Sequence, residues 1–152
     1  MLKILKNNAY IIILIVVVNK MINLTKYNIV IKINNLLNIY SNKYINIVFD
    51  NTLNIPALSF IKDTYPFIVI NVDLFPLSES VIAHILAHEY GHHVLHHVDT
   101  PSNLLTQSEI DICEDQADIY ASKFIYQYGF MKNPITNYLN NDTHRKYLLN
   151  AY

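Results

Sequence analysis

Residues 80–97, SVIAHILAHEYGHHVLHH, decide the fold expected for this chain. Aliphatic side chains recur here at the three- and four-residue spacing of one helix face, which predicts an α-helix over the whole stretch. Ser78 or Ser80 is expected to cap its N-terminus. The apolar stripe of this helix comprises Val81, Ile82, Ile85, Leu86, Val94 and Leu95.

The helix carries the HExxH motif His88-Glu89-Tyr90-Gly91-His92. Residues four apart lie on one helix face, about 5.4–6 Å along it, so two imidazoles can converge on one ion at Zn–N distances of about 2.0–2.1 Å. Glu89 lies about 100° around the helix from His88, where its carboxylate can activate a water without ligating the ion. The motif therefore predicts a zinc site with a glutamate base.

Histidine is dense around this motif, since six of the seven histidines lie between positions 84 and 97. A ladder at intervals of four consists of His84, His88, His92 and His96. Spacing alone allows several two-histidine sites, but only His88 and His92 bracket a glutamate directly after the first histidine. We expect the first and last members of the ladder to line the pocket or orient the ligands, and His93 and His97 to face solvent.

A second helix is expected over residues 106–128. Thr106 and Glu109 have the spacing of a capping box, and Gly129 suits the end of a helix. The buried seam of this helix is expected to comprise Ile110, Cys113, Ala117, Ala121, Phe124 and Tyr128.

The second helix also offers the third metal ligand that an open catalytic zinc site needs. Val98 occupies the position where a metzincin would have its third histidine. Glu114 can instead ligate the ion, while Asp118, one turn further on, can accept a hydrogen bond from a ligand histidine. Small residues at 117 and 121 would let the two helices approach closely. The alternative is a solvated acidic face, formed by Glu109, Asp111, Glu114, Asp115 and Asp118.

The rest of the chain predicts a small sheet. Strand-like runs occupy residues 44–49, 57–62 and 67–72, and Asp63-Thr64-Tyr65-Pro66 has the composition of a hairpin connection between the last two. Residues 21–42 could form a helix or a strand, because their apolar period is ambiguous. The tail, residues 134–152, predicts one or two short helices. The fold class is therefore α+β, with a small antiparallel sheet of about three strands packed on the two helices.

Length and composition narrow the class of protein. The 152 residues suffice for one domain, and a net charge of −1 argues against direct nucleic-acid binding, which needs a basic face. A single cysteine, Cys113, excludes an internal disulfide and a site with several thiolate ligands. This composition suits a reducing interior, so we expect a cytoplasmic protein.

Residues 1–20 form an apolar N-terminal segment that precedes a single domain at 21–152. Lys3 and Lys6 followed by the aliphatic run 11–18 resemble a signal peptide, but the run is too short to span a bilayer and no small-residue cleavage site follows. Three interpretations stay open: a buried strand or helix, a true start at Met21, or a signal or anchor.

Three segments in combination resemble the ImmA/IrrE metallopeptidases, gluzincin-type zinc peptidases common on phages and integrative elements. The segments are FIVIN at residues 67–71, ILAHEYGHHVLH at 85–96 and EDQADIYA at 114–121. The resemblance covers about residues 45–128 and implies a zincin-like minimal peptidase domain. It implies one zinc ion bound by His88, His92 and Glu114, with Glu89 as the catalytic acid/base. It also implies a protein substrate, a helix-turn-helix repressor of a phage or mobile element.

Two departures from the family concern the substrate groove. Tyr90 stands where the family often has leucine, and IYQY at residues 125–128 replaces its usual Leu-Leu-Met-Pro. A peptidase also needs a further donor for the oxyanion, and the candidates are His84, Tyr90, His96, Tyr120 and Tyr126. Two other functions remain open: a non-catalytic module that binds a repressor or another protein, and a membrane-anchored housekeeping metallopeptidase.

Overall fold

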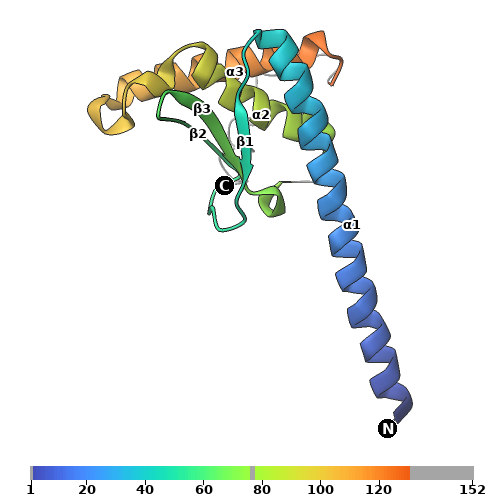
Figure 1. Ribbon diagram of the computed structural model, residues 1–152. Helices are drawn as coiled ribbons and strands as arrows, with labels where there is room; N and C mark the ends of the chain where they lie inside the picture. The colour runs from blue at the N-terminus through green and yellow to red at the C-terminus, as the bar shows by residue number, and fades with distance from the viewer. Residues whose placement is uncertain (1, 76–77, 131–152) are drawn as a thin grey trace.

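The computed structural model describes residues 2–75 and 78–130, and within them the chain has an α+β fold (Figure 1). The three helices are α1 (Leu2–Ser41), α2 (Glu79–Val94) and α3 (Gln107–Gln127). The three strands are β1 (Asn46–Phe49), β2 (Ala57–Lys62) and β3 (Tyr65–Ile70). Short 3₁₀ helices follow β3 (η1, Val72–Leu74) and link α2 to α3 (η2, His97–Asp99; η3, Ser102–Leu104). The helices predicted at 134–152 lie outside the described residues.

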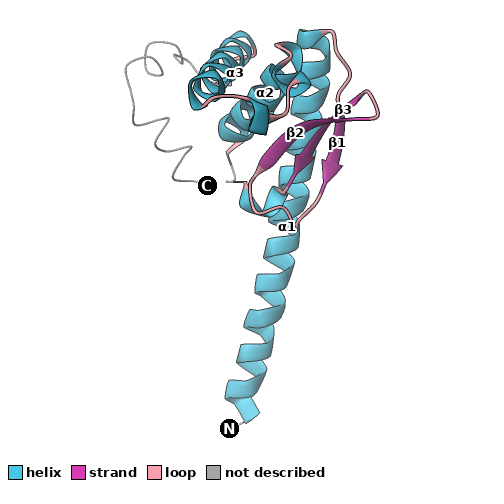
Figure 2. Cartoon of the chain, turned by 90° about the vertical axis from the view of Figure 1, so that its left-hand side faces the viewer, coloured by secondary structure: helices cyan, strands magenta, loops and turns pink. Residues whose placement is uncertain are grey.

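Helix α1 resolves the ambiguity of residues 21–42 in favour of a helix. Val30, Ile33 and Leu37 are fully buried, and their three- and four-residue spacing forms the stripe that packs on the rest of the domain. Residues 2–20 continue the same helix, which extends well past the sheet and the other helices (Figure 2). None of the helices in the described residues combines the length and apolarity needed to cross a bilayer.

The sheet is mixed, so the prediction of an antiparallel sheet is wrong for β1. The strand order is β1-β3-β2; β2 and β3 form an antiparallel hairpin, whereas β1 runs parallel to β3. All three strands begin within two residues of their predicted positions. The hairpin turn is tighter than predicted: Asp63 and Thr64 have positive φ, as in the two-residue turns that suit twisted strands, and the next two residues belong to β3.

Asn71, the residue after β3, ties the loop between β1 and β2 to the end of β3. Its side-chain amide donates to the backbone oxygens of Asn51 and Leu53, at 3.2 and 2.7 Å. Its backbone N–H donates to Pro56 at 2.9 Å. These bonds hold the loop between β1 and β2 across the end of β3, so β2 pairs on the far side of β3 from β1.

Helix α2 lies at the centre of the fold, in contact with α1, α3 and the hairpin. Ser78 occupies the N-cap position but makes no capping hydrogen bond with its side chain. The helix ends at Val94, three residues earlier than predicted, because His96 adopts a left-handed conformation with φ of 64°. Leu95, predicted to belong to the apolar stripe, consequently lies beyond the helix and is exposed.

Helix α3 begins and ends as predicted, and it packs unusually close to α2. The capping box of Thr106 and Glu109 is present, and Gly129 has a positive φ. A Cβ built on Gly91 of α2 would lie 3.0 Å from Cα of Ala117. Ala117 and Ala121 are fully buried, which agrees with the predicted role of small residues in this contact.

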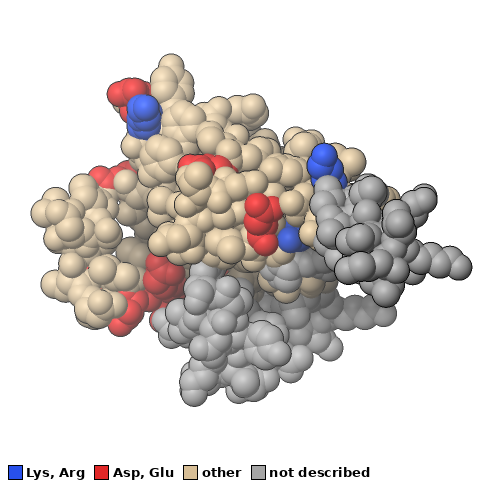
Figure 3. Space-filling view, turned by 90° about the horizontal axis from the view of Figure 1, so that it is seen from below, with Lys and Arg blue, Asp and Glu red and all other residues tan. Residues whose placement is uncertain are grey.

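The charged surface of the described residues is sparse. On the face seen in Figure 3, the few lysine side chains stand apart from one another, and some lie beside acidic side chains.

Candidate metal centre

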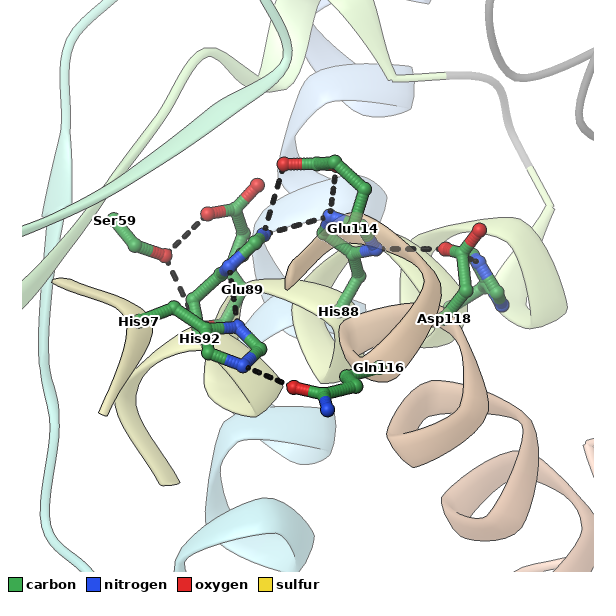
Figure 4. Close-up of polar contacts among 9 residues, drawn as sticks. Ser59, His88, Glu89, His92, His97, Glu114, Gln116 and Asp118 are labelled. Atoms are coloured by element: carbon green, nitrogen blue, oxygen red, sulfur yellow. Dashed lines mark hydrogen bonds and ion pairs between the residues drawn. The ribbon is translucent and has the colours of Figure 1, made fainter. Parts of the chain in front are cut away.

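The α2–α3 contact brings three potential ligand side chains together in one triangle (Figure 4). Nε2 of His88 lies 3.0 Å from Nε2 of His92 and 3.2 Å from Oε2 of Glu114. Nε2 of His92 lies 3.5 Å from Oε1 of Glu114. In a tetrahedral zinc site with bonds of about 2.0–2.2 Å, ligand atoms stand about 3.3 Å apart. The three side chains could therefore hold a single metal ion.

Asp118 contacts the far side of the His88 ring. Its Oδ1 lies 2.7 Å from Nδ1 of His88, and because a carboxylate only accepts, Nδ1–H donates. This hydrogen bond leaves Nε2 of His88 as the nitrogen available for a metal. The same oxygen lies 3.5 Å from Nε2 of buried His84. His84, His88 and Asp118 form a second cluster with possible ligand atoms, but the hydrogen bond to Nδ1–H makes this group a support for the first triangle.

The electrostatics of the cluster favour a cation. Burial alone lowers the pKa of His88, but hydrogen bonds with Asp118 and Glu114 raise it to about 10. Burial and the neighbouring His88 lower the pKa of His92 to about 4. The hydrogen bond with His88 lowers the pKa of Glu114. Without a metal, the cluster thus binds one proton on His88, which a divalent cation would replace.

Glu89 is buried next to this triangle and is held by a strand residue that the sequence did not single out. The hydroxyl of Ser59, on β2, contacts Oε2 of Glu89 and lies 3.0 Å from the Glu89 backbone oxygen. Burial raises the pKa of Glu89, whose charge is coupled to His88 and Glu114. The sequence does not reveal Ser59, because its signal is a single hydroxyl in a mostly apolar strand, thirty positions from its partner.

His93 and His97 were predicted to face solvent, but the structure shows that neither side chain does. His93 is buried, and its Nε2 lies 2.9 Å from the backbone oxygen of Phe67 on β3. His97 is half-buried, because the left-handed residue before it turns the chain back toward α2. Its Nδ1 lies 3.1 Å from Nδ1 of His92, and its Nε2 lies 2.9 Å from Oε1 of Gln116 (Figure 4).

His96 is not a wall of the pocket. Its side chain is 69% exposed, and its Nδ1 lies 2.9 Å from Oδ2 of Asp99. The left-handed conformation at this position takes the ring off the α2 face that it would occupy in a longer helix. Tyr126, another predicted oxyanion donor, is exposed as well.

The two other tyrosine candidates belong to the packing between helices. Tyr90 is fully buried, and its hydroxyl donates to side-chain oxygens of Asn34 and Asn38 on α1. Tyr120 packs its ring against Tyr40, with centroids 5.4 Å apart. The hydroxyl of Tyr90 is thus bound to α1, and neither of these hydrogen bonds joins it to the metal triangle. Of the five candidates, His84 is the one in contact with the cluster, through Asp118.

Comparisons with models of protein families, with curated proteins and with solved structures gave no significant match for this chain. Its function is therefore argued from the site.

Proposed function

We propose that this chain is a zinc-dependent endopeptidase. The observation that carries the proposal is the triangle of His88, His92 and Glu114, with a buried glutamate directly after the first histidine. Two imidazoles and one carboxylate are the ligand set of several catalytic zinc sites, and three protein ligands leave a fourth position open. The α+β arrangement also agrees with the zincin-like domain that the ImmA/IrrE resemblance implies.

Glu89 is the proposed acid/base. A zinc ion, when bound, lowers the pKa of water and polarises a carbonyl group. Glu89 accepts a proton from the attacking water and delivers it to the leaving amide nitrogen. Burial raises the pKa of Glu89 above its ordinary value, the direction that suits a group that must both accept and release a proton. The contact with Ser59 fixes the direction of its carboxylate.

The proposed substrate is an extended segment of a protein. Strand β2 lies at the edge of the sheet and carries Ser59, which contacts Glu89. An extended peptide can pair with such an edge through main-chain hydrogen bonds. The side chains of Leu58 and Ile61 on this strand are exposed and apolar. The family resemblance further suggests a helix-turn-helix repressor of a phage or mobile element as the substrate.

A cleavage assay tests this proposal. Zinc-loaded protein is incubated with candidate repressors, and the products are identified by mass spectrometry. Glu89→Gln should retain zinc and lose cleavage, because the amide cannot accept the proton. Glu79→Gln is the matched control, since it makes the same change in the first turn of α2, where Glu79 pairs with Lys32.

Three outcomes are informative. Cleavage by Glu89→Gln at the parental rate would refute the acid/base role. A protein that stays metal-free in zinc-replete buffer would refute the zinc site. Zinc binding together with capture of a repressor that is never cut would instead identify a non-catalytic binding module.

A further inference from the structure

The two histidines of the metal triangle have different outer partners. Nδ1 of His88 contacts a carboxylate, Asp118, at 2.7 Å. Nδ1 of His92 contacts another imidazole, His97, at 3.1 Å, and that ring contacts the amide of Gln116 at 2.9 Å. The proposed peptidase chemistry leaves this second chain of contacts unexplained.

The ring hydrogens of His92 and His97 can be placed in one consistent way along this series of contacts. Nε2 of His92 faces Glu114 and His88, so metal binding requires a lone pair there and puts the ring hydrogen on Nδ1. Nδ1 of His97 must then accept, which places the hydrogen of His97 on Nε2. That Nε2–H points at Oε1 of Gln116, an acceptor. Every donor in the chain therefore meets an acceptor.

The backbone holds His97 in this position. His96 adopts φ of 64° and ψ of 22°, and the backbone N–H of Asp99 donates to the His96 oxygen at 3.3 Å. The rings of His92 and His97 meet edge to face, with centroids 5.2 Å apart. A left-handed residue other than glycine costs free energy, so this turn needs the contacts around it.

We propose that His97 and Gln116 form a hydrogen-bond relay that orients His92 and keeps its Nε2 free for the metal. The inference rests on the proposed zinc site and adds two positioning residues to it. The groups of the relay are uncharged, whereas His88 donates its hydrogen bond to the charged carboxylate of Asp118. Helix α3 thus supplies a ligand, Glu114, and the ends of both outer contacts.

Zinc affinity measured by competition with a chromophoric chelator tests the relay. His97→Phe keeps a ring at the site but removes the acceptor, and it should weaken zinc binding about 10- to 100-fold, as the loss of such outer contacts does elsewhere. Gln116→Met changes an exposed side chain of similar length and should weaken binding less. Gln116→Glu ends the relay in a charged acceptor and should bind zinc at least as tightly as the parent. Gln107→Met, the control, makes the same change at an exposed glutamine of α3 that contacts Asp111 and lies outside the relay, and it should leave affinity unchanged.

A second readout is independent of affinity. Nitrogen-15 NMR of the zinc-loaded parent should show hydrogen on Nδ1 of His92 and on Nε2 of His97. The opposite tautomer of His97, or equal zinc affinities for His97→Phe and Gln107→Met, would overturn the relay alone. A parent protein that binds no zinc would overturn the proposed function itself. Circular dichroism of each metal-free variant verifies that it is folded.

Discussion

Removal of the Glu114 carboxylate should affect both folding and metal binding. The side chain of Glu114 is 47% exposed, and its ion-pair partners are the two histidines of the triangle. The two histidine side chains are only 18% and 13% exposed, so this half-buried interaction contributes more than an exposed ion pair does, about 1–3 kcal/mol. Glu114→Ala should therefore cost the metal-free protein about 1–3 kcal/mol of stability, and it also removes one of the three proposed ligands.

The expected loss of zinc affinity follows from the number of ligands. Structural sites with four ligands bind zinc with about 10–16 kcal/mol, which is roughly 2.5–4 kcal/mol for each ligand. Loss of one ligand should weaken binding roughly 10²- to 10³-fold. At a zinc concentration about 100 times the parental dissociation constant, zinc should stabilise the parent by about 2.7 kcal/mol. The variant should gain only about 0.4 kcal/mol or less under the same conditions.

Thermal unfolding with and without zinc measures both quantities. Asp111→Ala is the matched control, because Asp111 is an exposed carboxylate on the same helix that contacts Gln107 and lies outside the triangle. The control should keep the full zinc-dependent stabilisation. If Glu114→Ala is stabilised by zinc as strongly as this control, Glu114 is not a ligand and the geometry of the triangle has been misinterpreted.

Two further predictions concern packing and pH. Gly91→Ala should destabilise the fold by about 1–3 kcal/mol in urea unfolding, because the new Cβ would lie 3.0 Å from Cα of Ala117; unchanged stability would mean that α2 and α3 separate easily. Zinc affinity should rise about tenfold per pH unit between about pH 6.5 and 8.5, because His88, with its pKa raised to about 10, must release a proton to bind metal. Calorimetry in buffers of different ionisation enthalpy should detect that proton, and binding without proton release would contradict the prediction.

The parts of the site that could be predicted are those that depend on the spacing of residues within one helix. His88 and His92 are four residues apart on α2, and Glu114 and Asp118 are four apart on α3, so helix geometry alone groups each pair. The capping box of Thr106 fixed the start of α3 in the same way. Such features depend on residues within one or two turns, which sequence displays directly.

The parts that could not be predicted depend on contacts between distant segments. Helix α2 is buried on most of its faces, so periodicity did not reveal that Tyr90 points to α1 instead of the metal triangle. The direction of β1 depends on the loop that Asn71 holds, beyond the reach of any strand pattern. The turn at His96, which brings His97 onto His92, lacks the glycine that usually marks a left-handed residue.

The close contact of α2 with α3 brings the paired histidines of one helix and the paired carboxylates of the other into one cluster. Gly91 directly precedes His92, and the Ala117 backbone that it meets lies between Gln116 and Asp118 in the sequence. The facing atoms of His88, His92 and Glu114 lie 3.0–3.5 Å apart, so this cluster tolerates little change in the separation of the helices that carry it. The absence of a side chain at position 91 therefore matters to the metal site as well as to the core, because the distance between the helices sets the distance between ligand atoms.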